Sequence, residues 1–269
     1  MYCSGESGSR ERPYGLMRKS NPPASVTCSS STQLAEHNCY QRQYYETRDL
    51  PRMAPTGSPY VWRHLDRLLG VARFSESARL LEVGAGLGRY TFPLLERGFA
   101  VTALDLSPVL LDKLRLEASG YDLRTVACDI ADVAEHVDER FSQAVGFFTL
   151  HHMYDLGLVM RKLARVLTPR ARVAFCEPNA FNPLFYAQIV LTPSMTWRGD
   201  GGVTRMRPSI VLGAMEQAGF SEVGVERFGL FPPFLANRRL AGRLEQRLDA
   251  ALPMRWLRTF QIFHGTLAG

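Results

Sequence analysis

The sequence predicts an α/β fold, in which a doubly wound, mostly parallel seven-stranded sheet carries helices on both faces, with N-terminal helices and a cap insertion after the fifth strand. From Arg79 onward, short β-type runs alternate with amphipathic helical segments, which is typical of a parallel sheet. The apolar run 79–83 leads directly into a glycine-rich loop. Ser107-Pro108 places a capping residue before a proline, a common start of a helix.

We expect the strands to lie at residues 79–83, 100–105, 123–128, 143–149, 172–177, 222–228 and 259–264. The apolar and capping patterns predict helices over 32–47, from Pro59, near Gly88, from Pro108, from Ile130 (short), from Asp155, over 208–218 and over 238–252.

The chain of 269 residues divides by composition into three parts. Residues 1–31 lack apolar periodicity and predict a disordered tail. Residues 32–74 predict an N-terminal helical cap, and residues 75–269 predict the α/β domain. Within that domain, the aromatic-rich stretch 178–207 reads as an irregular insertion over a substrate site.

Charge and hydropathy limit the partners. No run approaches the roughly 20 apolar residues that a membrane helix needs, so we expect no membrane span. The net charge is +6, and 29 of the 32 basic residues are arginine. These arginines are spread along the chain without a dense basic block, as a GC-rich genome would also produce, so we expect no nucleic-acid partner.

The five cysteines include no C-x-x-C pair, and an odd number is poorly suited to a disulfide framework. We therefore expect reduced thiols and a cytoplasmic protein. The oligomeric state has no signal in the sequence.

The strongest local pattern is the glycine loop E-V-G-A-G-L-G at residues 82–88. Glycines let a backbone turn sharply and approach a ligand, and the helix that follows offers free N–H groups. A dinucleotide fingerprint counted from Gly84 needs a glycine where Arg89 stands, and no Gly-Lys-Ser/Thr follows as in a P-loop. Two carboxylates also end expected strands: Asp105 is suited to ribose hydroxyls, and Asp129 follows the third strand.

These motifs together resemble the class I, Rossmann-like S-adenosylmethionine-dependent methyltransferases, over about residues 79–269. The segment 163–169 is similar to a turn of that family, although Arg170 and Ala171 replace its two glycines. The resemblance implies S-adenosylmethionine as cofactor. It also implies that the cofactor-binding residues are Glu82, Gly84, Gly86, Gly88, Asp105, Leu106, Asp129, Ile130 and Thr149.

The methyl acceptor is expected beyond the carboxyl ends of the fourth and fifth strands. The residues predicted to contact it are Tyr44, Tyr154, Glu177, Asn179 and Trp197. His151 and His152 are the candidates for a general base, because imidazole titrates near neutrality. We choose His151 for this role and expect His152 to pack against the scaffold. Catalysis by positioning and desolvation alone remains the alternative.

Arg198, Arg205 and Arg207 in the insertion are suited to an anionic acceptor, although codon bias also explains them. Residues 142–150 contain no acidic ligand, so we expect no metal.

The sequence therefore predicts a metal-independent methyltransferase that acts on O, N or C of a small organic acceptor, in secondary-metabolite or cofactor biosynthesis. Two alternatives are a macromolecule (RNA or protein) methyltransferase of the same fold and a non-catalytic S-adenosylmethionine-binding protein. The sequence T-L-H-H at 149–152 differs from the N/D-P-P-Y/F motif of amino-methylating nucleic-acid enzymes, and the intact glycine loop opposes loss of the cofactor site.

Overall fold

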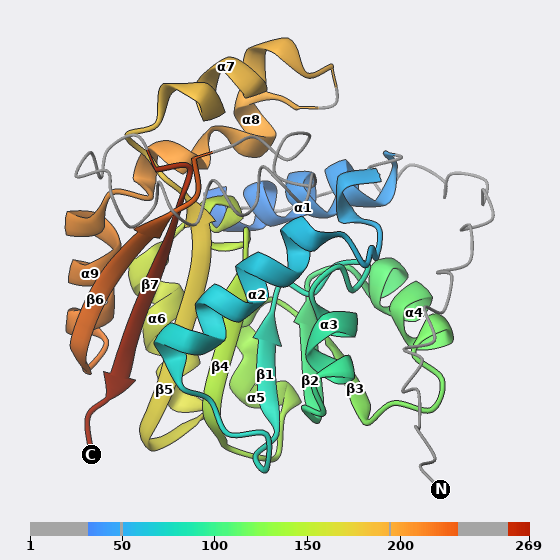
Figure 1. Ribbon diagram of the computed structural model, residues 1–269, viewed down its shortest axis with the longest axis vertical. Coiled ribbons are helices and arrows are strands. Elements are labelled where there is room, and N and C mark those ends of the chain that lie inside the picture. Colours follow the sequence, from blue (N-terminus) through green and yellow to red (C-terminus); the bar gives the residue numbers. More distant parts are fainter. Residues whose placement is uncertain (1–31, 49–50, 194, 231–257) are drawn as a thin grey trace, which may run out of the picture.

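The computed structural model describes residues 32–48, 51–193, 195–230 and 258–269 (Figure 1). The expected tail over 1–31 and the expected helix over 238–252 lie outside these residues.

Seven strands form one sheet in the order β3-β2-β1-β4-β5-β7-β6, which confirms the predicted fold class. Their bounds are β1 (Leu80–Val83), β2 (Val101–Asp105), β3 (Leu123–Ala127), β4 (Phe141–Phe147), β5 (Leu167–Pro178), β6 (Phe220–Phe228) and β7 (Phe260–Leu267). The pairs among β3, β2, β1, β4 and β5 are all parallel, and β7 runs antiparallel to both β5 and β6. The carboxyl ends of the parallel strands therefore meet at one edge of the sheet.

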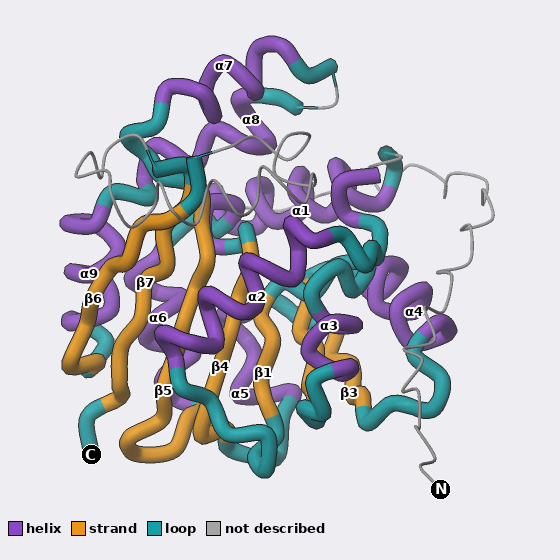
Figure 2. Tube along the Cα trace, in the orientation of Figure 1, coloured by secondary structure: helices purple, strands orange, loops and turns teal. Residues whose placement is uncertain are grey.

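Helices cover both faces of the sheet, as the tube view shows (Figure 2). The helices are α1 (Gln33–Glu46), α2 (Pro59–Ala72), α3 (Thr91–Glu96), α4 (Pro108–Glu117), α5 (Val133–His136), α6 (Leu156–Arg165), α7 (Pro183–Leu191), α8 (Trp197–Asp200) and α9 (Pro208–Gln217). One apolar cluster joins α2, α3 and α4 to the sheet, and a second joins α5, α6 and α9 to its other face. All four residues of β1 are buried, because a central parallel strand is covered on both sides.

Four short 3-10 helices complete the described structure: η1 (Pro51–Met53), η2 (Ile130–Asp132), η3 (Leu150–His152) and η4 (Gly201–Arg205).

The stretch 178–207 is more regular than the sequence suggested, because it contains α7, α8 and η4. Asn182 caps α7 by accepting a hydrogen bond from the Leu184 N–H, and Pro183 occupies the first turn. Thr196 caps α8 in the same way, through the Gly199 N–H. The apolar run of α7 lacks helical alternation of polar and apolar residues, which is why its sequence did not read as a surface helix.

Two further expectations need correction or comment. Cys39 in α1 is disulfide-bonded rather than a reduced thiol, whereas Cys128 and Cys176 are free. Arg170 stands where the resembled family has glycine, and it adopts a left-handed backbone with φ of 63°. This conformation costs a non-glycine residue about 1 kcal/mol, at the end of the sheet away from the glycine loop.

The helices α1, α7 and α8 lie beyond the carboxyl edge of the sheet (Figure 1). We call these three helices the cover. Tyr44 of α1 donates a hydrogen bond of 3.0 Å to Asp200 Oδ2 of α8, and the same oxygen accepts from the Thr196 N–H. Asp200 is buried, so this pairing ties two distant parts of the chain together.

Gly84 follows β1 and packs against Thr149, in the turn after β4. Its φ is +75°, and a Cβ placed there would lie 2.1 Å from Thr149 Oγ1. Gly98 has a φ of +88° but no atom within 4 Å of such a Cβ. Gly98→Ala therefore measures backbone strain alone, and Gly84→Ala measures strain plus a clash.

We expect Gly84→Ala to lower the free energy of unfolding by at least ~2 kcal/mol and Gly98→Ala by ~1 kcal/mol. Urea unfolding of both variants measures the difference. Equal losses would contradict the close packing of Gly84 against Thr149.

Candidate active site

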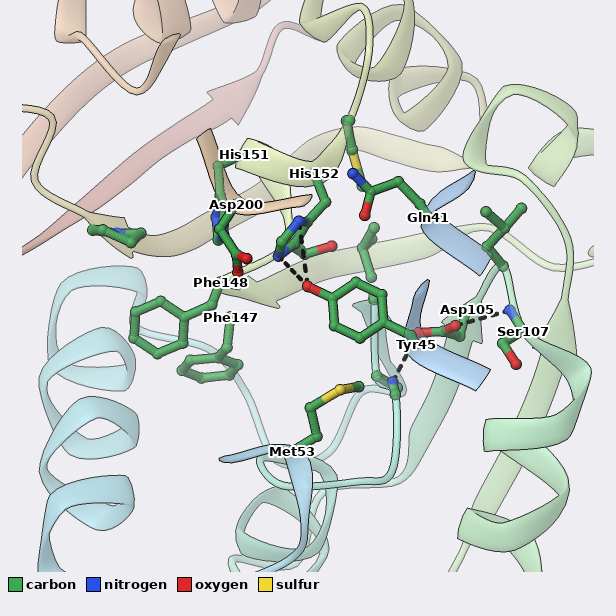
Figure 3. Close-up of a pocket in the computed structure, with 18 of the residues that line it drawn as sticks. Gln41, Tyr45, Met53, Asp105, Ser107, Phe147, Phe148, His151, His152 and Asp200 are labelled. Carbon is green, nitrogen blue, oxygen red and sulfur yellow. Dashed lines mark hydrogen bonds between the residues drawn. The ribbon is translucent and has the colours of Figure 1, made fainter. Parts of the chain in front are cut away.

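A cavity of about 890 Å³ lies between the carboxyl ends of β1 to β5 and the cover (Figure 3). The glycine loop, the ends of β2 and β3 and the turn after β4 line one part of it. Side chains of α1 and α7 and an aromatic group line the rest.

Among the described residues, no helix is long and apolar enough to cross a membrane.

The glycine loop takes its shape from left-handed backbone at Gly84, Gly86 and Gly88. The N–H groups of Gly84 and Ala85 both donate to the Leu104 carbonyl, at 2.7 and 3.1 Å, which holds the loop against β2. Gly84 and Gly86 line the cavity. Gly88 does not, because it packs against Leu114 of α4 and serves the entry into α3.

Asp105 ends β2 and braces the glycine loop. Its Oδ2 accepts from the Gly86 N–H at 2.8 Å, and its Oδ1 accepts from the Ser107 N–H at 2.9 Å (Figure 3). Burial raises the pKa of Asp105, and the hydrogen bonds from Ser107 and Gly86 oppose that rise. Each carboxylate oxygen has a second lone pair, so the side chain can still accept hydrogen bonds from a ligand.

Asp129 follows β3 and caps η2 by accepting from the Ala131 N–H at 2.9 Å. Its other oxygen accepts from the Asn38 side chain of α1. Asp129 therefore connects the carboxyl edge of the sheet to the cover. Leu106 and Ile130, the neighbours of the two acids, also line the cavity, as the sequence predicted for cofactor-binding residues.

Glu82 lies in β1 directly before the loop and is 2% exposed. Its Oε2 accepts from Thr91 Oγ1 at 2.6 Å. Burial raises the pKa of Glu82 from 4.5 to about 7, the Thr91 hydrogen bond opposes this, and the charge of Asp105 adds to it. The cavity therefore contains two neighbouring carboxyl groups that a bound positive charge would stabilise in ionised form.

His151 and Glu177 form a buried pair. Glu177 ends β5, and its Oε1 accepts from the Thr149 and Leu150 N–H groups at 2.8 and 2.7 Å. Its Oε2 accepts from His151 Nδ1 at 2.6 Å. Because Nδ1 carries the proton in this hydrogen bond, Nε2 of the neutral ring has a lone pair. Among the described residues, none forms a hydrogen bond with Nε2, and His151 lines the cavity.

His152 points to the cover. Its Nδ1 donates to the Gly199 carbonyl at 2.9 Å, so its Nε2 accepts from the Tyr45 hydroxyl at 2.8 Å. Figure 3 shows the Tyr45 ring reaching across the cavity to this imidazole. The His152 carbonyl accepts from His37 Nε2 at 2.6 Å. Both nitrogens of His152 are thus occupied in holding the cover.

The five residues predicted to contact the acceptor are not brought together. Tyr154 lines the cavity at an exposed edge, where its hydroxyl donates to Gln33. Tyr44 and Glu177 lie just behind the wall and support Asp200 and His151. Asn179 is buried and donates to the Arg258 carbonyl, and Trp197 is 54% exposed and stacks on Tyr186. Neither Asn179 nor Trp197 lines the cavity.

Sequence reasoning missed several lining residues, namely Leu34, Asn38, Gln41, Tyr45, Met53, Tyr60, Arg89, Tyr90, Phe147, Phe148 and Phe260. The tyrosine spacing of α1 indicated a helix face but not its orientation. The residues of β4 and β7 read as ordinary core strands.

An aromatic group forms one wall of the cavity. Tyr90 stacks on Phe147 with ring centres 4.0 Å apart, and Phe148 packs against Phe260 at 5.6 Å. Behind them His64 is buried, and its Nδ1 donates to the Tyr60 carbonyl at 2.7 Å. Burial lowers the pKa of His64 from 6.5 to about 3, so this ring is neutral and packs as an aromatic residue. The wall therefore contributes apolar surface rather than charge.

The comparisons with known proteins agree with the fold and the loop. Residues 81–175 match the family described as "Methyltransferase domain". Over 133 residues the chain is 27% identical to a tRNA 5-carboxymethoxyuridine methyltransferase of Escherichia coli, covering 48% of this chain and 51% of the relative. Over 129 residues it is 31% identical to a demethylmenaquinone methyltransferase of Tropheryma whipplei, covering 46% and 52%. The chain thus spans about half the length of the curated relatives it matches.

Among solved structures, it is similar to phosphoethanolamine N-methyltransferase 2 of Haemonchus contortus in complex with S-adenosyl-L-methionine. The TM-score is 0.55 with 14% identity, covering 86% of this chain and 56% of that one.

The sheet order, the glycine loop and the acidic strand ends define a Rossmann-like methyltransferase domain. Residues 81–175 match the methyltransferase domain family, and the fold is shared with a solved methyltransferase that holds S-adenosylmethionine. The observed residues fit that group. A Cβ at Gly86 would lie 2.9 Å from Met53 Cε, so the glycine lets Met53 approach the loop at the cavity. The buried Glu82 and the half-buried Asp105 suit a cofactor that carries positive charge and ribose hydroxyls.

The raised pKa of Glu82 predicts a pH dependence of stability. Glu82 keeps its proton in the folded protein up to about pH 7, whereas the unfolded chain releases it near 4.5. The proton on Glu82 thus stabilises the folded protein, and this contribution to the free energy of unfolding is complete below pH 4.5 and is lost as the pH rises through 7. Glu82→Gln mimics the protonated form, so without ligand it should be more stable than the wild type at pH 8, by up to ~3 kcal/mol. Urea unfolding at pH 5 and pH 8 measures the free energy of unfolding of both proteins. A difference between variant and wild type that is the same at both pH values would contradict the raised pKa of Glu82.

Asp105 provides the second prediction for this site. Asp105→Ala should weaken binding of S-adenosylhomocysteine at least about tenfold, because a charge-assisted contact and the brace on Gly86 are both lost. Isothermal calorimetry measures the affinity, with Asp112→Ala as the control, since Asp112 is exposed and pairs with Arg115 on the surface of α4. Equal affinities of the two variants would show that Asp105 does not face the cofactor.

Proposed function

We propose that this protein transfers the methyl group of S-adenosylmethionine to an oxygen of a small, largely apolar organic acceptor. The observation that supports this most directly is the His151–Glu177 pair, which places an imidazole with a free Nε2 on the cavity wall. A nitrogen or carbon acceptor uses the same cavity, but a hydroxyl gains most from a base that removes its proton.

The glycine loop, Asp105 and Asp129 would hold the cofactor, with Leu106, Ile130 and Thr149 beside it. When bound, the cofactor supplies an electrophilic methyl group on a sulfonium. Glu82 stands next to the loop, where its carboxylate form is favoured by that positive charge.

His151 acts on the acceptor. Its Nε2 would take the hydroxyl proton of the acceptor, whose oxygen would receive the methyl group that the bound cofactor supplies, with neutral S-adenosylhomocysteine as the other product. The imidazolium formed in this step is stabilised by Glu177, whose carboxylate accepts from Nδ1 at 2.6 Å. Glu177 stays oriented because the Thr149 and Leu150 N–H groups bind its other oxygen.

The apolar wall favours an organic acceptor and excludes water. Tyr90, Phe147, Phe148 and Phe260 line the cavity, and Leu184 and Met195 line it from the insertion. Removing water strengthens the electrostatic contacts of the reacting groups. The likeness to the demethylmenaquinone methyltransferase supports a biosynthetic role.

A macromolecular acceptor is the second candidate, because one similar protein is a tRNA methyltransferase. The apolar wall and the absence of a dense basic run in the sequence favour the small acceptor. The two are separated by incubating the protein with methyl-labelled S-adenosylmethionine and either a panel of small phenols or bulk tRNA. Label in tRNA alone would overturn the small-molecule proposal.

His151→Ala should lower turnover about 10²-fold if Nε2 takes the proton. S-adenosylhomocysteine affinity should stay near that of the wild type. The pH profile of the rate should differ between the wild type and the variant, because the variant has no group at this position that takes the proton. His152→Ala is the matched control, because it should loosen the cover and lower thermal stability without changing the pH profile. An unaltered profile in His151→Ala would mean that catalysis here is positioning and desolvation.

A further inference from the structure

Large apolar side chains gather on the outer side of α7 and at the start of α8. Phe181, Leu184, Val190, Leu191 and Trp197 are between 49% and 79% exposed. They are five of the eight large apolar residues exposed among the described part of the chain, and they lie within 17 consecutive positions. We call these five residues the α7 surface. Scattered exposed apolar residues are ordinary, but a group of this kind marks an interaction site.

Figure 1 shows where this surface lies. The helix α7 is an outermost element of the fold, on the far side of α1 and α8 from the sheet. Of its nine residues, only Ile189 is buried. The helix packs against the core through Phe185, Tyr186 and Ile189 and leaves its other large apolar residues, Leu184, Val190 and Leu191, exposed.

The exposed charges within residues 178–207 are of one sign. Residues 178–207 contain three arginines and one acid, Asp200, which is buried and bonded to Tyr44 and Thr196. Arg227 lies over the Phe181 ring at 5.8 Å. Arg207 is close enough to Tyr186 of α7 to oppose the rise that burial causes in the pKa of its hydroxyl. An apolar surface bordered by exposed arginines is complementary to anionic lipid headgroups above a hydrocarbon layer.

The α7 surface continues into the cavity. Leu184, Ala187 and Leu191 are exposed and also line the cavity, and they are spaced three and four residues apart on one face of the helix. An apolar molecule can therefore pass from the outside of α7 to the aromatic wall along a continuous apolar path.

We propose that the α7 surface docks on an anionic lipid bilayer and that the methyl acceptor is a membrane-resident amphiphile which enters the cavity along α7. The docking is inferred from the α7 surface alone, whereas the assignment of the acceptor rests on the proposed function. Phe181, Val190 and Trp197 insert among the lipid chains, and Arg198 and Arg207 bind headgroups. The acceptor's polar end reaches His151 while its apolar tail follows Leu184 and Leu191.

Docking is tested by flotation of the full chain with vesicles of phosphatidylcholine, with and without 30 mol % phosphatidylglycerol. We expect binding to the anionic vesicles, with a blue shift of tryptophan fluorescence that Trp197→Phe removes. Phe181→Glu/Val190→Glu should weaken binding at least about tenfold. Leu116→Glu is the matched control, because Leu116 is 79% exposed on α4. Neither Phe181 nor Val190 lines the cavity, so S-adenosylhomocysteine binding should not change in the double variant.

The acceptor class is tested by calorimetry of 4-ethylphenol and 4-octylphenol with protein saturated in S-adenosylhomocysteine. We expect 4-octylphenol to bind at least about tenfold more tightly than 4-ethylphenol. Equal affinities would overturn the assignment of the acceptor as an amphiphile.

Wild-type protein that does not float with anionic vesicles, or equal losses in the double variant and Leu116→Glu, would overturn docking. Concentration-dependent dimers that the double variant abolishes, without flotation, would assign the α7 surface to a second copy of the chain instead. The proposed function predicts that S-adenosylhomocysteine binds whether or not the protein binds vesicles. A measurement of S-adenosylhomocysteine binding therefore distinguishes failure of docking from failure of the proposed function.

Discussion

The arrangement of the site depends on one buried carboxylate, Glu177. It stands at the end of β5 with no exposed surface, and its two oxygens accept from two backbone N–H groups and from His151. A charge that is removed from water is tolerated only when its hydrogen-bonding capacity is filled. Glu177 therefore fixes the turn after β4, the ring of His151 and the tautomer of that ring together. The parallel pairing of β4 with β5 brings these groups to one edge of the sheet.

The cofactor side follows a different physical principle. There the buried Glu82 lies near the half-buried Asp105, and desolvation raises the pKa of both. Their ionised forms lack full compensation in the protein alone, whereas Glu177 accepts three hydrogen bonds. In the proposed function, the first pair receives a cation and the second site generates one on His151. The proposal thus assigns cofactor binding and proton transfer to different parts of a single cavity.

The sequence was sufficient for the sheet because each strand carried its own apolar run and each parallel strand ended in a recognisable loop or acid. It was not sufficient for the cover. Tyr44 and Tyr45 are adjacent, and one helical step decides that Tyr44 binds Asp200 while Tyr45 reaches His152. That orientation is set by packing against α8, about 150 residues away, and no local pattern records it. The helix α7 escaped notice because apolar residues occupy both its buried and its exposed sides, so they follow no burial period.

The contacts of His152 have a consequence for the proposed base. His152 binds Tyr45 and Gly199 through its ring and His37 through its carbonyl, and it directly follows His151. Both histidines lie in η3, a single turn of 3-10 helix. The contacts that hold the cover therefore also hold the backbone of the proposed base, so the position of α1 and the alignment of His151 are mechanically coupled.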